Sequence, residues 1–159
     1  MRLSESLVFV PLFEPKDVAA GAYVSDAVDL AQLNGFSAIL TFGAITGNSV
    51  LTVNGDSTSA LATALTTPIA FKYRLGAADY KAALADQFGD PIAVASTGLT
   101  LVAATFDHRT IVIEIDPDTL PAGAHWVTFN ISAVANPGLV AGVGVGAARM
   151  PGHLIPSVL

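Results

Sequence analysis

Few residues of this 159-residue chain could carry chemistry, and they lie far apart in the sequence. The segment Gly142–Ala147 fits the dinucleotide-binding pattern G-x-G-x-x-A, which holds a pyrophosphate only where a helix follows within a β-α-β unit. Twelve residues follow Ala147 and two of them are Pro, which argues against such a helix. We interpret the glycines as positions that allow a close-packed or bent strand, and we expect no cofactor.

The side chains that could bind a metal ion lack the spacing of a ligand set. Asp116–Pro117–Asp118 has a D-x-D form, but Pro after a strand end is also a common way to open a turn. His108, His125 and His153 show no spacing such as H-x-x-x-H, and the chain has no cysteine. We expect no metal site, with a calcium site at Asp116–Asp118 as the alternative.

Catalytic groups are equally scattered. Asp107 and His108 could join a serine in a triad, but the chain has no G-x-S-x-G elbow. A hydrolase or sugar-modifying enzyme would need two carboxylates to converge in one cleft. The candidates for such a pair are Asp26, Asp29, Asp56, Asp107, Glu114 and Asp116. Because they fall at the ends of different expected strands, we predict that the protein is not an enzyme.

The elements that would position these residues are mostly strands. Phe36–Phe42 and Ser49–Asn54 alternate apolar and polar residues, and Gly43 and Gly47 between them predict a hairpin. Further strands are expected at Tyr23–Leu30, Ile69–Leu75, Leu99–Thr105, Thr110–Asp116, His125–Val134, with Trp126 in the core, and Leu139–Ala148. Ala77–Phe88 is Ala-rich and stops at a glycine, which predicts a short helix.

This pattern predicts an all-β fold, an antiparallel β-sandwich or jelly-roll-like domain of about eight strands with one short helix. We assign residues 1–20 to an N-terminal arm, 21–148 to the sandwich and 149–159 to a C-terminal tail. Pro11 and Pro15 argue against a helix or a central strand in the first segment. The apolar side chains Leu7, Phe9 and Phe13 either pack on the core of their own domain or extend to a neighbouring subunit.

Composition limits the partners. Charged residues make up 13% of the chain and hydrophobic residues 52%, so much of the surface is either covered by partners or apolar. The net charge of −6 and the thinly spread basic residues argue against nucleic-acid binding. The apolar run Leu139–Ala148 is shorter than the roughly 20 residues that span a membrane. We expect a soluble protein, made in a reducing cytoplasm, that binds neither nucleic acid nor membrane.

Four segments in order carry a family resemblance. They are VDLAQLNGFSAILTFGAITG from Val28, FKYRLGA from Phe71, TIVIEIDPDTLPAGAHWVTFNIS from Thr110, and LVAGVGVGAARMPGHLIP from Leu139. This order resembles the head decoration, or cement, proteins of tailed bacteriophages over most of residues 20–156. The chain departs from that pattern at VNGDSTS after the predicted hairpin, and at Met150–Pro151.

The resemblance implies a β-sandwich homotrimer on the outer capsid surface of a virion, made in the cytoplasm of a bacterial host. Its partners would be the major capsid protein and further copies of itself. The residues expected at these interfaces are Leu7, Phe9, Phe13, Arg149, Met150, His153, Leu154 and Ile155. The alternative is a tail or receptor-binding component of the virion, which would need exposed aromatic side chains to stack on sugar rings.

Overall fold

The computed structural model describes residues 7–59, 66–77, 87–132 and 138–148. Strands dominate the described residues, and each strand pair is antiparallel. The elements are β1 (Leu7–Asp17), η1 (Val18–Ala20), β2 (Tyr23–Val24), β3 (Val28–Asp29), β4 (Leu33–Ile45), β5 (Ser49–Asp56), β6 (Thr67–Ile69), β7 (Phe71–Leu75), β8 (Ile92–Val94), β9 (Leu99–Leu101), α2 (Ala103–Phe106), β10 (Thr110–Ile115), η2 (Pro117–Thr119), β11 (Trp126–Ile131) and β12 (Gly138–Ala148).

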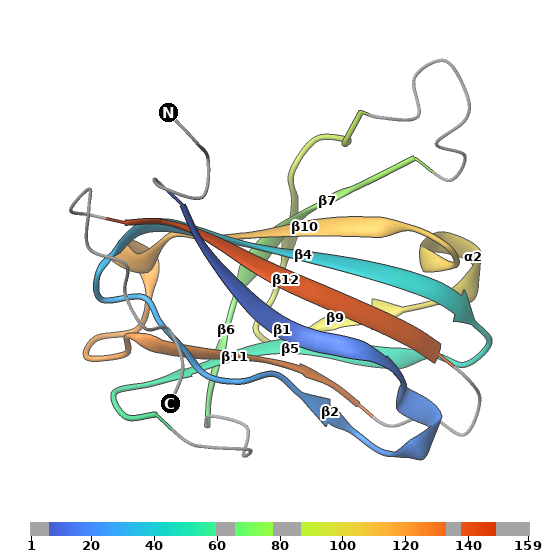
Figure 1. The fold of residues 1–159 in the computed structure, drawn as a ribbon, viewed down its shortest axis with the longest axis horizontal. Coiled ribbons are helices and arrows are strands. Elements are labelled where there is room, and N and C mark those ends of the chain that lie inside the picture. The colour runs from blue at the N-terminus through green and yellow to red at the C-terminus, as the bar shows by residue number, and fades with distance from the viewer. Residues whose placement is uncertain (1–6, 60–65, 78–86, 133–137, 149–159) are drawn as a thin grey trace.

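The strands form two sheets packed face to face, which confirms the predicted all-β sandwich (Figure 1). Sheet A has the strand order β1-β12-β4-β10-β7-β8. Sheet B has the order β2-β11-β5-β6, with β3 also paired to β11 and β9 also paired to β5. Among the described residues no helix is long and apolar enough to cross a membrane.

Period-2 alternation builds the core between the sheets. Strand β4 turns Phe36, Ala38, Leu40 and Phe42 inward, as its sequence predicts. Opposite them, β5 of sheet B buries every second residue, and β11 buries Thr128 in addition to its inward residues. The fully buried apolar side chains of these two strands are Leu51, Val53, Val127, Phe129 and Ile131, each no more than 1% exposed.

The predicted hairpin between β4 and β5 is wrong. Strand β4 pairs with β10 and β12 in sheet A, whereas β5 pairs with β11, β6 and β9 in sheet B. Residues 46–48 therefore carry the chain from one layer to the other. The segment Ile69–Leu75 divides in the same way, because β6 lies in sheet B and β7 in sheet A. Alternation is the same whether two strands pair edge to edge or face each other across a core.

Two other expected strands are interrupted. Tyr23–Leu30 breaks at Ser25, whose buried Oγ accepts the Phe129 N–H at 2.9 Å, so a side chain replaces part of the strand pairing. Leu99–Thr105 ends as strand β9 at Leu101 and continues as helix α2, which buries Phe106 against the ring of Phe42. Most of the predicted helix Ala77–Phe88 lies outside the described residues.

Leu7–Asp17 belong to the sandwich, although the sequence predicted an arm over residues 1–20, of which residues 1–6 lie outside the described residues. Strand β1 pairs with β12 from Leu7↔Ala147 to Asp17↔Leu139 and forms the edge of sheet A. Pro11 is tolerated because an edge strand leaves one side of its backbone unpaired. Phe13 is 3% exposed and packs on the ring of Tyr23 at 4.9 Å, so β1 is also fixed to sheet B.

The glycines of β12 are packed against the core, in agreement with the close-packed strand expected for Gly142–Ala147. A Cβ atom on Gly144 would lie 2.3 Å from Cζ of Phe36, and one on Gly142 would lie 2.4 Å from Cδ2 of Leu40. Any larger residue at these positions must displace a buried side chain. Strand β12 can therefore lie between β1 and β4 only because its inward positions from Gly142 to Gly146 carry no side chain.

Candidate functional site

The carboxylates considered for catalysis serve mainly to hold turns. Asp116 accepts the Asp118 N–H at 3.0 Å and so caps η2. Asp116–Asp118 therefore opens a turn after a strand, as the proline in this segment indicated. Asp107 accepts the Ile45 N–H at 2.8 Å and joins the end of α2 to the end of β4. Asp26 is exposed beside β2. Within the described part of the chain, no group of three or more His, Cys, Asp or Glu could hold a metal ion.

One of these carboxylates, Asp56, has a lowered pKa, and Asp17 has a lowered pKa for the same reason. Backbone N–H groups of Ala19 and Gly138 donate to Asp17 at 2.9 Å and lower the pKa of its carboxyl. The Ser57 N–H and the Thr66 hydroxyl lower the pKa of Asp56 likewise. These bonds stabilise the charged form at the ends of strands, and they are structural.

One polar cluster lies at an end of sheet B. Nδ1 of His125 lies 3.1 Å from Oδ1 of Asp29, and the His125 ring lies 5.8 Å from that of Trp126. Trp126 pairs with Asp29 on β3 and with Asp56 on β5. Its side chain is half-buried, and it shares the outer face of sheet B with Asn130, so its predicted place in the core is wrong. The reason is register, because Val127 next to it points inward.

The most extensive feature is the outer face of sheet A, here called the sheet A face. Strand register places its side chains in rows that cross five strands, from β1 through β12, β4 and β10 to β7. The two central rows are Phe9–Val145–Ser37–Glu114–Lys72 and Pro11–Val143–Ile39–Val112–Arg74.

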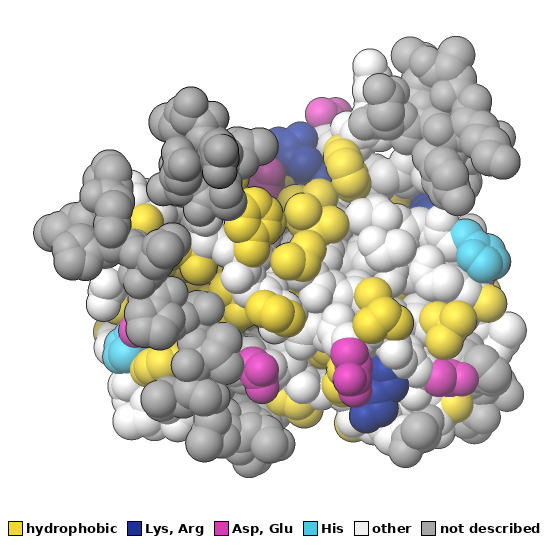
Figure 2. Space-filling view, viewed as in Figure 1, with side chains coloured by type: hydrophobic (Ala, Val, Ile, Leu, Met, Phe, Trp, Pro, Cys, Tyr) yellow, Lys and Arg dark blue, Asp and Glu magenta, His cyan; other side chains and the backbone are white. Residues whose placement is uncertain are grey.

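The second row is apolar except at Arg74, and the first is apolar on β1 and β12. Phe9 is 51% exposed, and Val143, Val145, Ile39 and Val112 are half-buried. Figure 2 shows hydrophobic side chains gathered over these strands among small and polar groups. In an antiparallel sandwich the outward positions of a strand are normally polar. The sheet A face is therefore an apolar surface of the kind that marks an interaction site.

Charged groups occupy the β10–β7 side of this face. Nε of Arg74 lies 3.0 Å from Oε1 of Glu114, and the same guanidinium donates to the Gly89 carbonyl at 3.3 Å. Both side chains of this ion pair are well exposed, so the pair contributes little to stability. This ion pair marks the boundary of the apolar part of the sheet A face.

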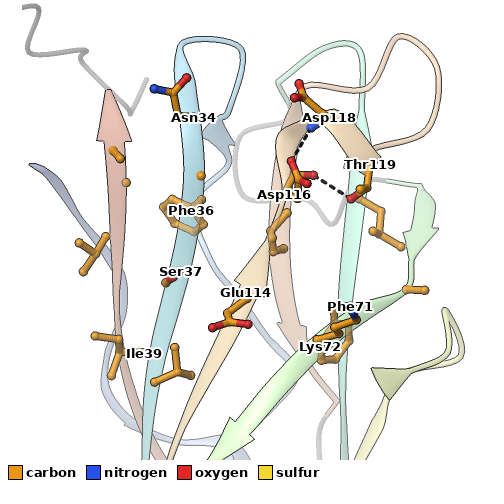
Figure 3. A pocket seen from close by; sticks show the side chains of 18 of the residues that line it. Asn34, Phe36, Ser37, Ile39, Phe71, Lys72, Glu114, Asp116, Asp118 and Thr119 are labelled. Carbon is orange, nitrogen blue, oxygen red and sulfur yellow. Dashed lines mark hydrogen bonds between the residues drawn. The ribbon is translucent and has the colours of Figure 1, made fainter. Parts of the chain in front are cut away.

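An open groove of about 1210 Å³ crosses one end of the sheet A face. Its lining extends from Leu7 and Val145 on one side to Ala93 and Val94 on the other. Figure 3 shows the middle of this groove, where Ser37 and Ile39 of β4 lie near Glu114 of β10, with Lys72 of β7 beyond it and Asn34 at the upper end of β4. Above them, η2 contributes Asp118 and Thr119, beside the capping residue Asp116.

The structure places the predicted interface residues differently. Phe9 projects from the sheet A face and Leu7 lines the groove, whereas Phe13 is buried in the core. Arg149, Met150, His153, Leu154 and Ile155 lie outside the described residues. Sequence reasoning missed four residues at the centre of the face: Ile39, Val112, Val143 and Val145. The available signal was that TIVI in β10 and VGV in β12 are apolar without full alternation, which indicates a strand with two apolar faces.

Comparisons with known proteins identify no family for this chain. No family model matches the sequence, and no curated protein matches it. Among solved structures, the crystal structure of the SPBc2 prophage-derived protein YomS is similar over 87% of this chain and 92% of that chain. The two share 9% sequence identity and superpose with a TM-score of 0.42.

Proposed function

We propose that this protein is a virion structural protein that decorates a phage capsid and stabilises it by binding the lattice of the major capsid protein. The observation that carries the proposal is the sheet A face, whose apolar part crosses the four strands β1, β12, β4 and β10 in a chain with only 13% charged residues. The sequence resemblance to head decoration proteins supports the same role. The proposed assembly is a homotrimer on the outer capsid surface, and the role requires no catalytic group.

The stabilising mechanism follows from binding to one state of the shell. A protein that binds the expanded lattice and not the unexpanded one adds RT ln(1 + [L]/Kd) of stability at each site. Because binding is repeated over the lattice, modest affinity at each site resists internal pressure collectively. An apolar docking surface suits this role, since the burial of apolar side chains contributes affinity that depends little on ionic strength.

The test is co-sedimentation of the purified protein with three separated fractions of the particle that it belongs to: expanded heads, unexpanded proheads and tails. We expect saturable binding to expanded heads alone. Val143→Lys places a charge in the centre of the sheet A face and should weaken head binding at least tenfold. Thr100→Lys adds the same charge at an exposed position of β9 in sheet B and is the matched control. Head binding by V143K equal to that of T100K would refute the proposal.

A second candidate function is a tail or receptor-binding component. The observation in its favour is Trp126, which lies half-buried at the surface of sheet B with carboxylates on both neighbouring strands. An indole ring flanked by polar groups can bind a sugar ring by stacking. Binding to tails rather than heads, together with glycan binding that Trp126→Ala abolishes, would favour this function.

A further inference from the structure

We infer that the groove on the sheet A face binds one extended segment of a partner protein, with apolar side chains and at least one Lys or Arg. This inference names the chemistry of the partner and rests on the proposed function. The floor of the groove sets the apolar requirement, because Ile39, Val112 and Val145 line it together with Leu7. Burying these side chains requires apolar atoms opposite them.

The dimensions of the groove favour a polypeptide. Its lining runs from β12 through β4, β10 and β7 to β8. Four strand spacings of about 4.8 Å give a length of roughly 19 Å, which about six residues of extended chain would cover. The volume of about 1210 Å³ exceeds the range of about 300–1,000 Å³ that is typical of small-molecule sites. The groove is also open to solvent.

The charged residues that line the groove indicate the charge that a partner segment should carry. Among the described residues that line the groove, the carboxylates are those of Glu114, Asp116 and Asp118, and the ammonium is that of Lys72. Glu114 is paired with Arg74, so the carboxylate that carries the argument is that of Asp116 at the η2 end. A basic side chain of the partner there would meet Asp116, whose Oδ1 caps the turn. The chain as a whole is acidic, with a net charge of −6, and attracts a basic segment from a distance.

Two variants that change the charge of the groove should change the binding affinity in opposite directions. Asp116→Asn removes the charge but keeps an oxygen that can cap η2, so the fold is preserved. We expect D116N to weaken binding to the particle fraction that the wild type binds by about threefold to tenfold. Lys72→Glu should strengthen it by a similar factor. Both effects should diminish at high salt because the groups are exposed. Unchanged affinity in both variants, or changes of the opposite sign, would overturn the inference.

Photo-cross-linking identifies the occupant directly. A benzophenone side chain introduced at Ser37, in the middle of the groove, is irradiated with separate head and tail fractions, and the same group at Thr100 is the control. We expect cross-links from position 37 to a segment of about six residues with apolar and basic side chains. Cross-links to an acidic or uncharged segment, to a second copy of this chain, or none from position 37 overturn the inference.

The outcomes also separate this inference from the proposed function. A cross-link from position 37 to a basic, apolar segment of a tail protein would refute the head role and retain the inference. Saturable head binding that neither charge variant alters would retain the head role and refute the inference about the groove.

Discussion

The substitution Gly144→Ala tests whether β12 is held against the core as closely as its geometry indicates. The added Cβ would lie 2.3 Å from Cζ and 2.8 Å from Cε2 of Phe36, well inside contact distance. Phe36 has little room to move, because it is 3% exposed and its ring lies 6.2 Å from that of Phe129. Overpacking of this kind costs about 1–3 kcal/mol.

The expected change in stability is smaller than the steric term alone. Replacing Gly by Ala lowers the conformational entropy of the unfolded chain, which stabilises the folded protein by about 0.4–1 kcal/mol. We therefore expect G144A to lower the free energy of unfolding by about 1–2 kcal/mol. With a urea m-value of about 2 kcal/mol/M, the unfolding midpoint should fall by about 0.5–1 M. The melting temperature should fall by about 2–4 °C per kcal/mol.

Two further variants make the result specific. Gly35→Ala adds the same methyl group on β4, where no atom lies within 4 Å, and should leave stability unchanged or slightly increased. In G144A/F36L the ring atoms that the new Cβ meets are removed, so the loss should be at least about 0.5 kcal/mol smaller than the sum of the single losses. A G144A protein as stable as wild type, or strictly additive losses, would refute the close packing of β12.

Three other predictions follow from single contacts. Ser25→Ala leaves the buried Phe129 N–H without its acceptor and should cost about 1–3 kcal/mol in urea unfolding, whereas Ser25→Thr, which keeps the hydroxyl, should cost less. Asp17 has a lowered pKa when folded, so its stabilising contribution is present above the unfolded pKa near 3.8 and is lost as pH falls through the lower folded value. D17N should therefore lose less stability on acidification than wild type between pH 5 and 2, and parallel pH profiles would contradict this. Removing the exposed Arg74–Glu114 pair should change stability by about 1 kcal/mol or less in a double-mutant cycle, and a larger coupling would show that the pair is structural.

Sequence reasoning located the strands because burial on one face leaves a period of two. The inward sets of β4 and β11 follow directly from that period. The partner of each strand was harder to predict, since alternation shows which face is buried and not which strand lies beside it. The β4–β5 hairpin was wrong for this reason. Trp126 was predictable in principle, because its own alternation groups it with Thr128 and Asn130 and opposite Val127.

The candidate site could not be predicted as a site. Its central row brings Val143, Ile39 and Val112 together from three distant parts of the chain, and only the register of β12, β4 and β10 aligns them. Phe9 was predicted at an interface and does lie exposed on this face, but Phe13 is buried. The two residues differ in exposure because the register of β1 shifts between Pro11 and Phe13. No residue type in this segment predicts that shift.

The position of β12 has a consequence for how the chain folds during synthesis. This strand lies between β1 and β4, so these two long strands are joined only through β12, which leaves the ribosome after both. Until residue 148 has emerged, β1 has no partner strand and the inward side chains of β4 lack their glycine-lined neighbour. Sheet A can therefore form only after β12 has been synthesised, as expected for a β topology dominated by distant pairings. A nascent chain stalled before β12 would expose Val8, Val10 and Leu12, and it would depend on a chaperone to stay in solution.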